Sequence, residues 1–111
     1  MTEGDVLLTP IPQADGSMKN RPALFLREMP PFRDILVCGI STQLRHEVKN
    51  FDSLISPGDP DFSSSGLMRD SLIRLGYLAV LSRNQIPGVI GSISAERHIS
   101  LLKRLGTYLT G

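Results

Sequence analysis

Three side chains of this sequence could together bind a phosphodiester: Arg21, Ser41 and Arg74. Arg21 directly precedes Pro22, which keeps the backbone extended, so the guanidinium leaves the chain from a defined point. Ser41 ends the most apolar run of the chain, and Arg74 interrupts the apolar run 72–75. Planar cations pair with the non-bridging oxygens of a phosphate, and hydroxyls donate hydrogen bonds to them. These residue types therefore indicate phosphodiester chemistry.

Each of these residues also has an ordinary structural explanation. Arg21 fits a solvated loop charge, Ser41 a turn residue, and Arg74 an outward-facing side chain on a half-exposed strand. Tyr77, next to Gly76, could stack on a base, although packing within a strand is the simpler explanation. The phosphodiester hypothesis therefore depends on the three residues acting together.

Several other kinds of chemistry lack their residues. The one cysteine, Cys38, lies in an apolar run, which indicates a packed thiol rather than a nucleophile. The two histidines, His46 and His98, are far apart in the sequence and lack zinc-ligand spacing. The chain has neither the Gly-x-Ser-x-Gly motif of hydrolases nor a phosphate-binding Gly-rich loop. We therefore expect no metal site and no cofactor.

Short apolar runs separated by turn-forming residues must position the candidate side chains. The sequence predicts strands over Val6–Thr9, Pro22–Leu26, Ile35–Ile40, Ser71–Leu75, Leu78–Leu81 and Val89–Ile93. Ile35–Ile40 is expected at the centre of the sheet, and Gly76 is expected to mark a bulge. Pro10-Ile11-Pro12 is expected to end the first strand, with a long connection to the second.

Only the last segment has helical periodicity. Ser94 is a good N-cap, and Gly106 is expected just beyond the last turn. Three apolar residues recur at helical spacing between them: Ile99, Leu102 and Leu105. The stretch Pro57–Gly66 has no apolar period and is predicted to be a surface loop. The chain is therefore predicted to be mainly β with a C-terminal α-helix.

Composition limits the classes of protein that this chain can represent. Its 111 residues, 41% apolar and 21% charged, fit one globular domain over residues 1–111. A formal charge of +1 excludes a protein that coats nucleic acid by bulk charge, although the chain after Asp61 holds six basic and two acidic residues. The apolar runs are too short to span a membrane, and the acidic N-terminus and single cysteine favour a cytoplasmic protein.

Taken in order and at matching spacing, five segments resemble the PemK/MazF family of toxin endoribonucleases. The segments are Gly4–Leu8, Asp15-Gly16-Ser17 with Arg21-Pro22-Ala23-Leu24, Leu36–Gln43, Asp70–Leu75 and Ile90–Ser94. The resemblance covers most of the chain and implies an SH3-like β-barrel of the PemK/MazF type with a terminal helix.

The resemblance also implies a function. Members of the family cleave single-stranded RNA without a metal, at selected sequences, by attack of a ribose 2′-OH on the adjacent phosphate. It implies a homodimer and a cognate antitoxin whose disordered tail covers the RNA site. Arg21 corresponds to the catalytic arginine, Ser41 to a position that is usually threonine, and Arg74 to a second arginine of some members. The expected substrate contacts are Asp15, Ser17, Lys19, Thr42, Gln43 and Tyr77.

Gly76 departs from the family pattern. Two residues after Arg74, several active members carry an Asp or Glu that could act as general base, so the proton acceptor stays open among Asp15, Glu28 and His46. The departure keeps a second hypothesis open, a catalytically weak barrel that binds RNA or an antitoxin. A third is a structural homo-oligomer, which would show no salt-dependent affinity for RNA.

Overall fold

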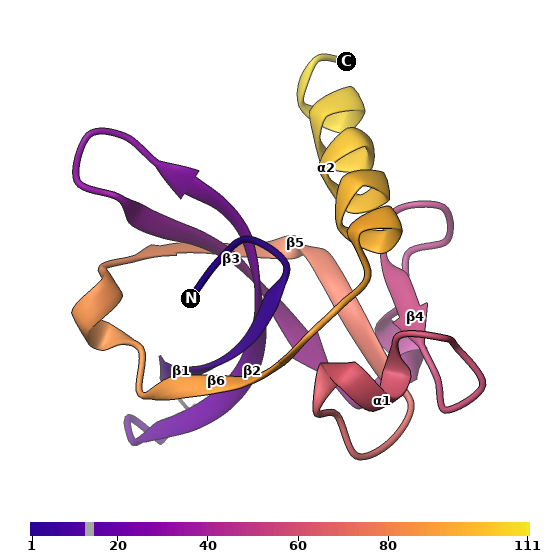
Figure 1. The fold of residues 1–111 in the computed structure, drawn as a ribbon, viewed down its shortest axis with the longest axis horizontal. Coiled ribbons are helices and arrows are strands. Elements are labelled where there is room, and N and C mark those ends of the chain that lie inside the picture. Colours follow the sequence, from indigo (N-terminus) through magenta and orange to yellow (C-terminus); the bar gives the residue numbers. More distant parts are fainter. Residues whose placement is uncertain (13–14) are drawn as a thin grey trace.

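The computed structural model describes residues 1–12 and 15–111 and is built on one antiparallel sheet (Figure 1). In sheet order the strands are β4 (Ser53–Ile55), β5 (Ser71–Leu81), β3 (Asp34–Ser41), β2 (Met18–Met29), β1 (Asp5–Pro12) and β6 (Gly88–Ser92). The helices are α1 (Phe62–Ser65) and α2 (Ala95–Leu109), and the 3-10 turns are η1 (Leu44–His46) and η2 (Arg83–Gln85). The prediction of a mainly β chain with a C-terminal α-helix is confirmed.

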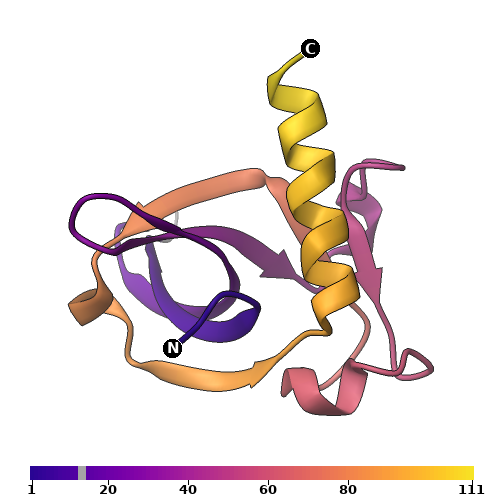
Figure 2. The same cartoon turned by 45° about the horizontal axis from the view of Figure 1, so that its top comes forward.

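The sheet curls into a half-barrel, and α2 stands against one side of it (Figure 2). In the described part of the chain the two outer strands, β4 and β6, do not pair with each other, and α1 lies along β6 instead. Ser64 Oγ donates a hydrogen bond to the Ser92 carbonyl at 3.0 Å. Gly91 permits this approach, because a Cβ there would lie 2.3 Å from the Ser64 carbonyl oxygen. Helix α1 therefore covers part of the outer edge of β6.

Both faces of the central strands are buried. One face packs against Leu101 and Leu105 of α2. The sheet residues on this face are Val6, Leu24, Leu26, Cys38, Ile40, Ile73 and Leu75. The opposite face buries Leu7, Ala23, Phe25, Ile35 and Val37. A strand that is covered on both faces is apolar throughout rather than alternating. The predicted place of Ile35–Ile40 at the centre of the sheet, between β5 and β2, is therefore confirmed.

The expected stop of the first strand at Pro10 is wrong, because β1 runs to Pro12. After Leu8, which pairs with Gly88, β1 has β2 as its only strand partner in the described residues. Proline lacks a backbone donor and is tolerated on such an edge. The long connection is wrong as well, because β2 begins at Met18 and extends the hairpin towards its tip.

The bulge predicted at Gly76 is confirmed. Cys38 pairs with Leu78 and Gly39 pairs with Arg74, so the three β5 residues 75–77 have no pairing partner on β3. Extra residues on one strand bend it and raise its local twist. The bulge therefore sets the direction of the β5 segment that begins at Ser71 and carries Arg74.

The prediction of a surface loop over Pro57–Gly66 is only partly correct. The segment contains α1, and both Asp61 and Ser65 are buried. Ser65 Oγ donates to the Phe62 carbonyl at 2.6 Å, so this polar side chain is satisfied inside the fold. Strand β4, directly before this segment, was not predicted, because three residues are too few to show a period.

Helix α2 begins as predicted and ends later. Ser94 is the N-cap, and its side-chain oxygen accepts a hydrogen bond from the Arg97 amide at 3.1 Å. The helix continues through Gly106 to Leu109, and Ile99 is 50% exposed rather than part of the core. The buried positions are Leu101 and Leu105, because they face the curled sheet. None of the helices in the described residues is long and apolar enough to cross a membrane.

Arg97 fixes the N-terminal end of α2 to the segment before α1. Its Nε donates to Asp61 Oδ2 at 2.9 Å, and its Nη2 donates to Asp59 Oδ2 at 3.1 Å. Its Nη1 donates to Ser53 Oγ at 2.7 Å, at the start of β4. Asp61 Oδ2 also accepts from the Ser94 amide at 3.0 Å. The hydrogen bond from Arg97 lowers the pKa of the Asp61 carboxyl to about 2.

We expect Arg97→Ala to lower the free energy of unfolding by about 3 kcal/mol, because it leaves the buried Asp61 carboxylate without its main partner. Urea unfolding measures the change. The matched control is Arg27→Ala, which removes an exposed ion pair with Glu3 and should cost less than about 1 kcal/mol. Equal losses in the two variants would contradict the role given to Arg97.

Candidate functional site

Register places the three phosphodiester-binding candidates on one face and at one end of the sheet. Ala23 of β2 lies opposite Gly39 of β3, and Gly39 lies opposite Arg74 of β5. Arg21 and Ser41 are each two residues from this row towards the same end, and side chains two apart share a face. The sheet therefore brings together, from three adjacent strands, residues that are far apart in the sequence.

The Tyr77 ring packs over Gly39, and the Arg74 guanidinium lies beside that ring. A Cβ at position 39 would lie 2.9 Å from Tyr77 Cδ1, so the ring occupies the space that a side chain would fill. The Arg74 guanidinium carbon lies 5.9 Å from the centroid of the Tyr77 ring, which is a cation–π arrangement. Tyr77 remains 44% exposed, so packing on the strand and contact with a ligand are compatible.

Ser41 ends β3 at a tight turn. Its Oγ accepts a hydrogen bond from the Gln43 amide at 3.0 Å, which leaves the hydroxyl proton available to a ligand. Thr42 and Gln43 are exposed, and Gln43 Oε1 accepts a hydrogen bond from Arg45. The Ser41 hydroxyl can therefore donate a hydrogen bond to a phosphate oxygen.

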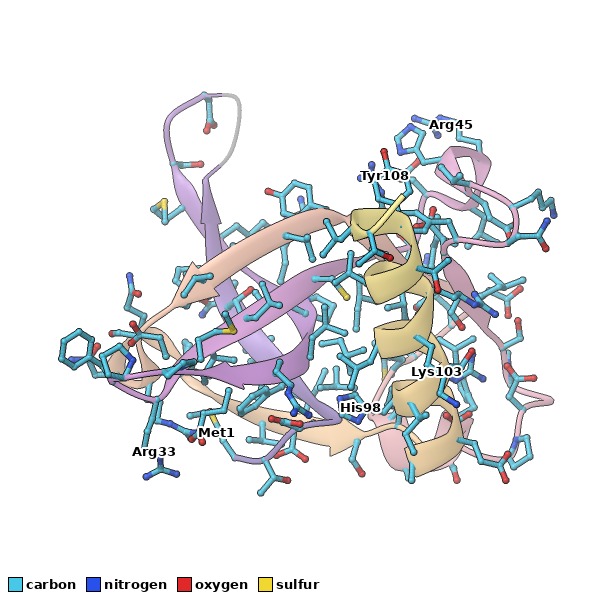
Figure 3. All side chains as sticks on the ribbon, turned by 90° about the horizontal axis from the view of Figure 1, so that it is seen from above. Met1, Arg33, Arg45, His98, Lys103 and Tyr108 are labelled. Carbon is cyan, nitrogen blue, oxygen red and sulfur yellow. The ribbon has the colours of Figure 1, made fainter. Side chains whose placement is uncertain are left out.

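Three further candidates lie on the β1–β2 hairpin, which projects from the rest of the sheet (Figure 3). Asp15 Oδ1 accepts from the Ser17 hydroxyl at 2.6 Å and from the Ser17 amide at 2.9 Å. These hydrogen bonds lower the pKa of the Asp15 carboxyl. A lowered pKa makes Asp15 a weak proton acceptor at neutral pH. Lys19 is exposed on β2, opposite Ile11 of β1.

The other two candidate bases lie at different places in the fold. Glu28 accepts from Arg33 and Arg83 at 2.7 Å each, and these bonds lower the pKa of its carboxyl. It is also seven residues beyond Arg21 along β2, or about 23 Å. His46 is exposed in η1, just after the end of β3. Among the three candidates, only His46 follows the strand that carries the Ser41 hydroxyl.

A carboxylate at position 76 would not point towards the candidate site. A Cβ on Gly76 would have the Phe51 ring as its nearest neighbour, at 4.0 Å. Phe51 packs on the α2 side of the sheet, whereas Tyr77 lies over Gly39 on the opposite face. The departure at Gly76 therefore removes no group from the face that carries Arg21 and Ser41.

Sequence reasoning missed two cavities. One, of about 370 Å³, lies at the end of β3, and its lining includes Ser41, Thr42, Met68, Arg69, Ser71 and Ile90. The second, of about 1170 Å³, is a mainly apolar groove between α2 and the bulge, and its lining includes Phe51, Gly76, Leu78, Ile99 and Tyr108. In the sequence Ile99 has the same spacing as the core residues Leu102 and Leu105, so no sequence signal separates it from the core; the structure shows it exposed in this groove. We call it the α2 groove.

Cys38 and His98, the other reactive side chains that the sequence analysis considered, are packed within the fold. Cys38 is fully buried, and burial raises the pKa of its thiol to about 12, which confirms the prediction of a packed thiol. His98 is half-buried, with Nε2 2.8 Å from the Leu26 carbonyl oxygen. The described residues contain no group of three or more His, Cys, Asp or Glu side chains that could hold a metal ion.

Comparison with known proteins gives a family match over almost the whole chain. The model of the PemK-like, MazF-like toxins of type II toxin–antitoxin systems matches residues 2–109. The fold is similar to that of the Mycobacterium tuberculosis toxin MazF-mt6, with a TM-score of 0.67, 20% sequence identity and 96% of each chain covered. Among curated proteins none matches this sequence. The half-barrel with its terminal helix is therefore the MazF-like fold.

Gly39→Ala is expected to displace the Tyr77 ring, because the new methyl group would overlap it. We expect this variant to lower the free energy of unfolding by about 1–3 kcal/mol in the native sequence. In a Tyr77→Ala background the same substitution should cost much less, because the overlapping ring is absent. Urea unfolding of the four proteins forms a double-mutant cycle, and additive effects would contradict the packing of Tyr77 on Gly39.

Proposed function

The chain belongs to the PemK-like, MazF-like toxin family of type II toxin–antitoxin systems, and we propose that it is an endoribonuclease that cleaves single-stranded RNA. The observation that carries this proposal is the placement of Arg21, Ser41 and Arg74 on one face, at one end of three adjacent strands. Two guanidinium groups and a hydroxyl form a suitable set of donors for a phosphodiester.

The reaction that fits these residues needs no metal. The ribose 2′-oxygen attacks the adjacent phosphorus, the bond to the 5′-oxygen breaks, and the 5′-oxygen takes a proton from water, so that a cyclic phosphate and a 5′-hydroxyl result. Arg21 and Arg74 stabilise the negative charge that grows on the non-bridging oxygens, and the Ser41 hydroxyl donates a hydrogen bond to one of them. A guanidinium stays protonated at any physiological pH, so charge stabilisation is its role. His46 is our candidate for the group that accepts the 2′-OH proton.

The surrounding residues suit a short stretch of unpaired RNA. The partly exposed Tyr77 ring offers a stacking surface for one base. Thr42 and Gln43, exposed beside Ser41, offer groups that can hydrogen-bond base edges. Asp15, Ser17 and Lys19 on the β1–β2 hairpin would contact the RNA further along the strand. Contacts to base edges would make cleavage sequence-selective, and a cognate antitoxin would inhibit it.

A second candidate function follows from the open proton acceptor. A barrel with Arg21, Ser41 and Arg74 but with an inefficient base would bind RNA or an antitoxin and turn over slowly. RNA binding without cleavage by the purified chain would favour this candidate over the endoribonuclease.

We also propose that the protein is a homodimer and that the α2 groove is part of the interface. The groove has a volume of about 1170 Å³ and a mainly apolar lining, and an exposed apolar surface of this kind is typical of an interaction site. Tyr108 and Leu109, which are 70% and 68% exposed, lie on its rim at the end of α2. A second copy would cover these side chains.

Arg21→Ala should reduce cleavage of single-stranded RNA by about 100-fold or more, because it removes charge stabilisation from the transition state. The assay uses the purified chain with EDTA present, and product ends identify the cyclic phosphate. Arg21→Lys should restore only part of the rate, because lysine lacks the planar fork. Arg27→Ala, farther along the same strand, is the control. Wild-type cleavage that Arg21→Ala leaves unchanged would refute the assignment.

Ile99→Glu should shift a dimer towards monomer, because a carboxylate would be buried in the α2 groove. The helix itself should tolerate the change, since the new carboxylate is four residues before Lys103. Val80→Glu is the control, because Val80 is exposed on β5 outside the groove. Sedimentation velocity gives the oligomeric state, and equal behaviour of both variants would contradict this interface.

A further inference from the structure

Asp52 is a buried carboxylate that the proposed chemistry does not use. It is 5% exposed and directly precedes β4. Its Oδ1 accepts a hydrogen bond from the Leu75 amide at 3.1 Å, and its Oδ2 accepts from the Val48 amide at 2.9 Å. Both carboxylate oxygens are therefore bonded to backbone groups of segments far from each other in the sequence.

The Leu75 amide is at a point where β5 loses both of its neighbouring strands. Pairing of β4 with β5 ends at Ser53 opposite Ile73. Pairing of β3 with β5 is interrupted between the pair Gly39–Arg74 and the pair Cys38–Leu78. A buried amide needs an acceptor. The Asp52 side chain supplies it, in the place where a strand carbonyl would otherwise be.

The segment held in this way separates two residues of the proposed RNA site. Arg74 directly precedes Leu75, and Tyr77 ends the bulge. The Tyr77 ring packs on Gly39, and the Arg74 guanidinium lies 5.9 Å from the ring centroid. A change in the path of the bulge would therefore move both side chains at once.

We propose that Asp52 is a positioning residue for the RNA site: its bond to the Leu75 amide holds the bulge in the path that keeps Tyr77 on Gly39 and Arg74 beside Tyr77. The role in RNA cleavage rests on the proposed function, whereas the conformational role does not.

Helix α2 fixes Asp52 from the other side. Arg104 Nη1 donates to the Asp52 carbonyl oxygen at 2.8 Å and to the Phe51 carbonyl oxygen at 3.3 Å. Burial and, to a smaller extent, the Asp52 charge raise the pKa of the Cys38 thiol, in keeping with a carboxylate that lies close to the central strand. Asp52 is therefore anchored through its main chain as well as through its carboxylate.

The first experiment uses Asp52→Ala and needs no RNA. The methyl side chain has no acceptor, so the Leu75 and Val48 amides both lose theirs. The Tyr77 ring should shift the Gly39 Hα resonances in the NMR spectrum of the wild type, and we expect Asp52→Ala to reduce that shift. The control is Asp59→Ala, whose carboxylate bonds the Ser56 amide and Arg97 instead.

The second experiment measures RNA cleavage in a double-mutant cycle with Arg74→Ala. We expect Asp52→Ala to lower kcat/KM by about tenfold in the native sequence and by much less when Arg74 is already absent. A residue that acts only on global stability would lower activity equally in both backgrounds. All assays are run well below the unfolding temperature of each variant.

Each outcome decides the proposal. Unchanged Gly39 Hα shifts in a folded Asp52→Ala protein, or equal activity losses in both backgrounds, would overturn it. If Asp52→Ala does not fold, amide hydrogen exchange of the wild type takes its place, and a Leu75 amide that exchanges as fast as an unprotected amide would overturn the proposal. If the wild type does not cleave RNA, the proposed function fails, and the Gly39 shifts alone decide the role of Asp52.

Discussion

The register break between β3 and β5 is the constraint on which the candidate site depends. Two strands in continuous pairing would present a flat row of alternating side chains. The three unpaired residues 75–77 instead bring the Tyr77 ring over Gly39 and next to Arg74. Such a break leaves a buried amide at Leu75, and the Asp52 carboxylate satisfies it. The geometry of the end of the sheet that carries Arg74 and Tyr77 therefore depends on the Asp52 carboxylate.

Helix α2 supports this arrangement through two arginines. Arg97 joins its first turn to Asp61 and to the start of β4 at Ser53. Arg104, two turns later, donates to the main chain at Phe51 and Asp52, just before the same strand. The helix thus holds the N-terminal end of β4, and β4 in turn pairs with the part of β5 that leads to Arg74.

These bonds change what the charge distribution means. The sequence gives the chain after Asp61 a basic excess, which suggested a basic face. Arg97 donates hydrogen bonds to Asp61, and Arg104 donates to the Asp52 carbonyl oxygen. Arg83 forms an ion pair with Glu28. The basic excess of the sequence is therefore not a uniformly basic surface. A protein of formal charge +1 fits a small site with two guanidinium groups better than extended contact with a nucleic-acid backbone.

The sequence by itself determined the fold class, the central strand, the bulge at Gly76 and the N-cap at Ser94, because each depends on local composition or on residue-specific backbone preferences. Only the tertiary structure decided that β1 continues through its prolines, that α1 packs on β6, and that Ile99 lies outside the core. These features depend on which strand has a free edge and which helix face meets the sheet. The role of Asp52 could not be predicted from the sequence either, because its partner at Leu75 is 23 residues away and is set by the register of three strands.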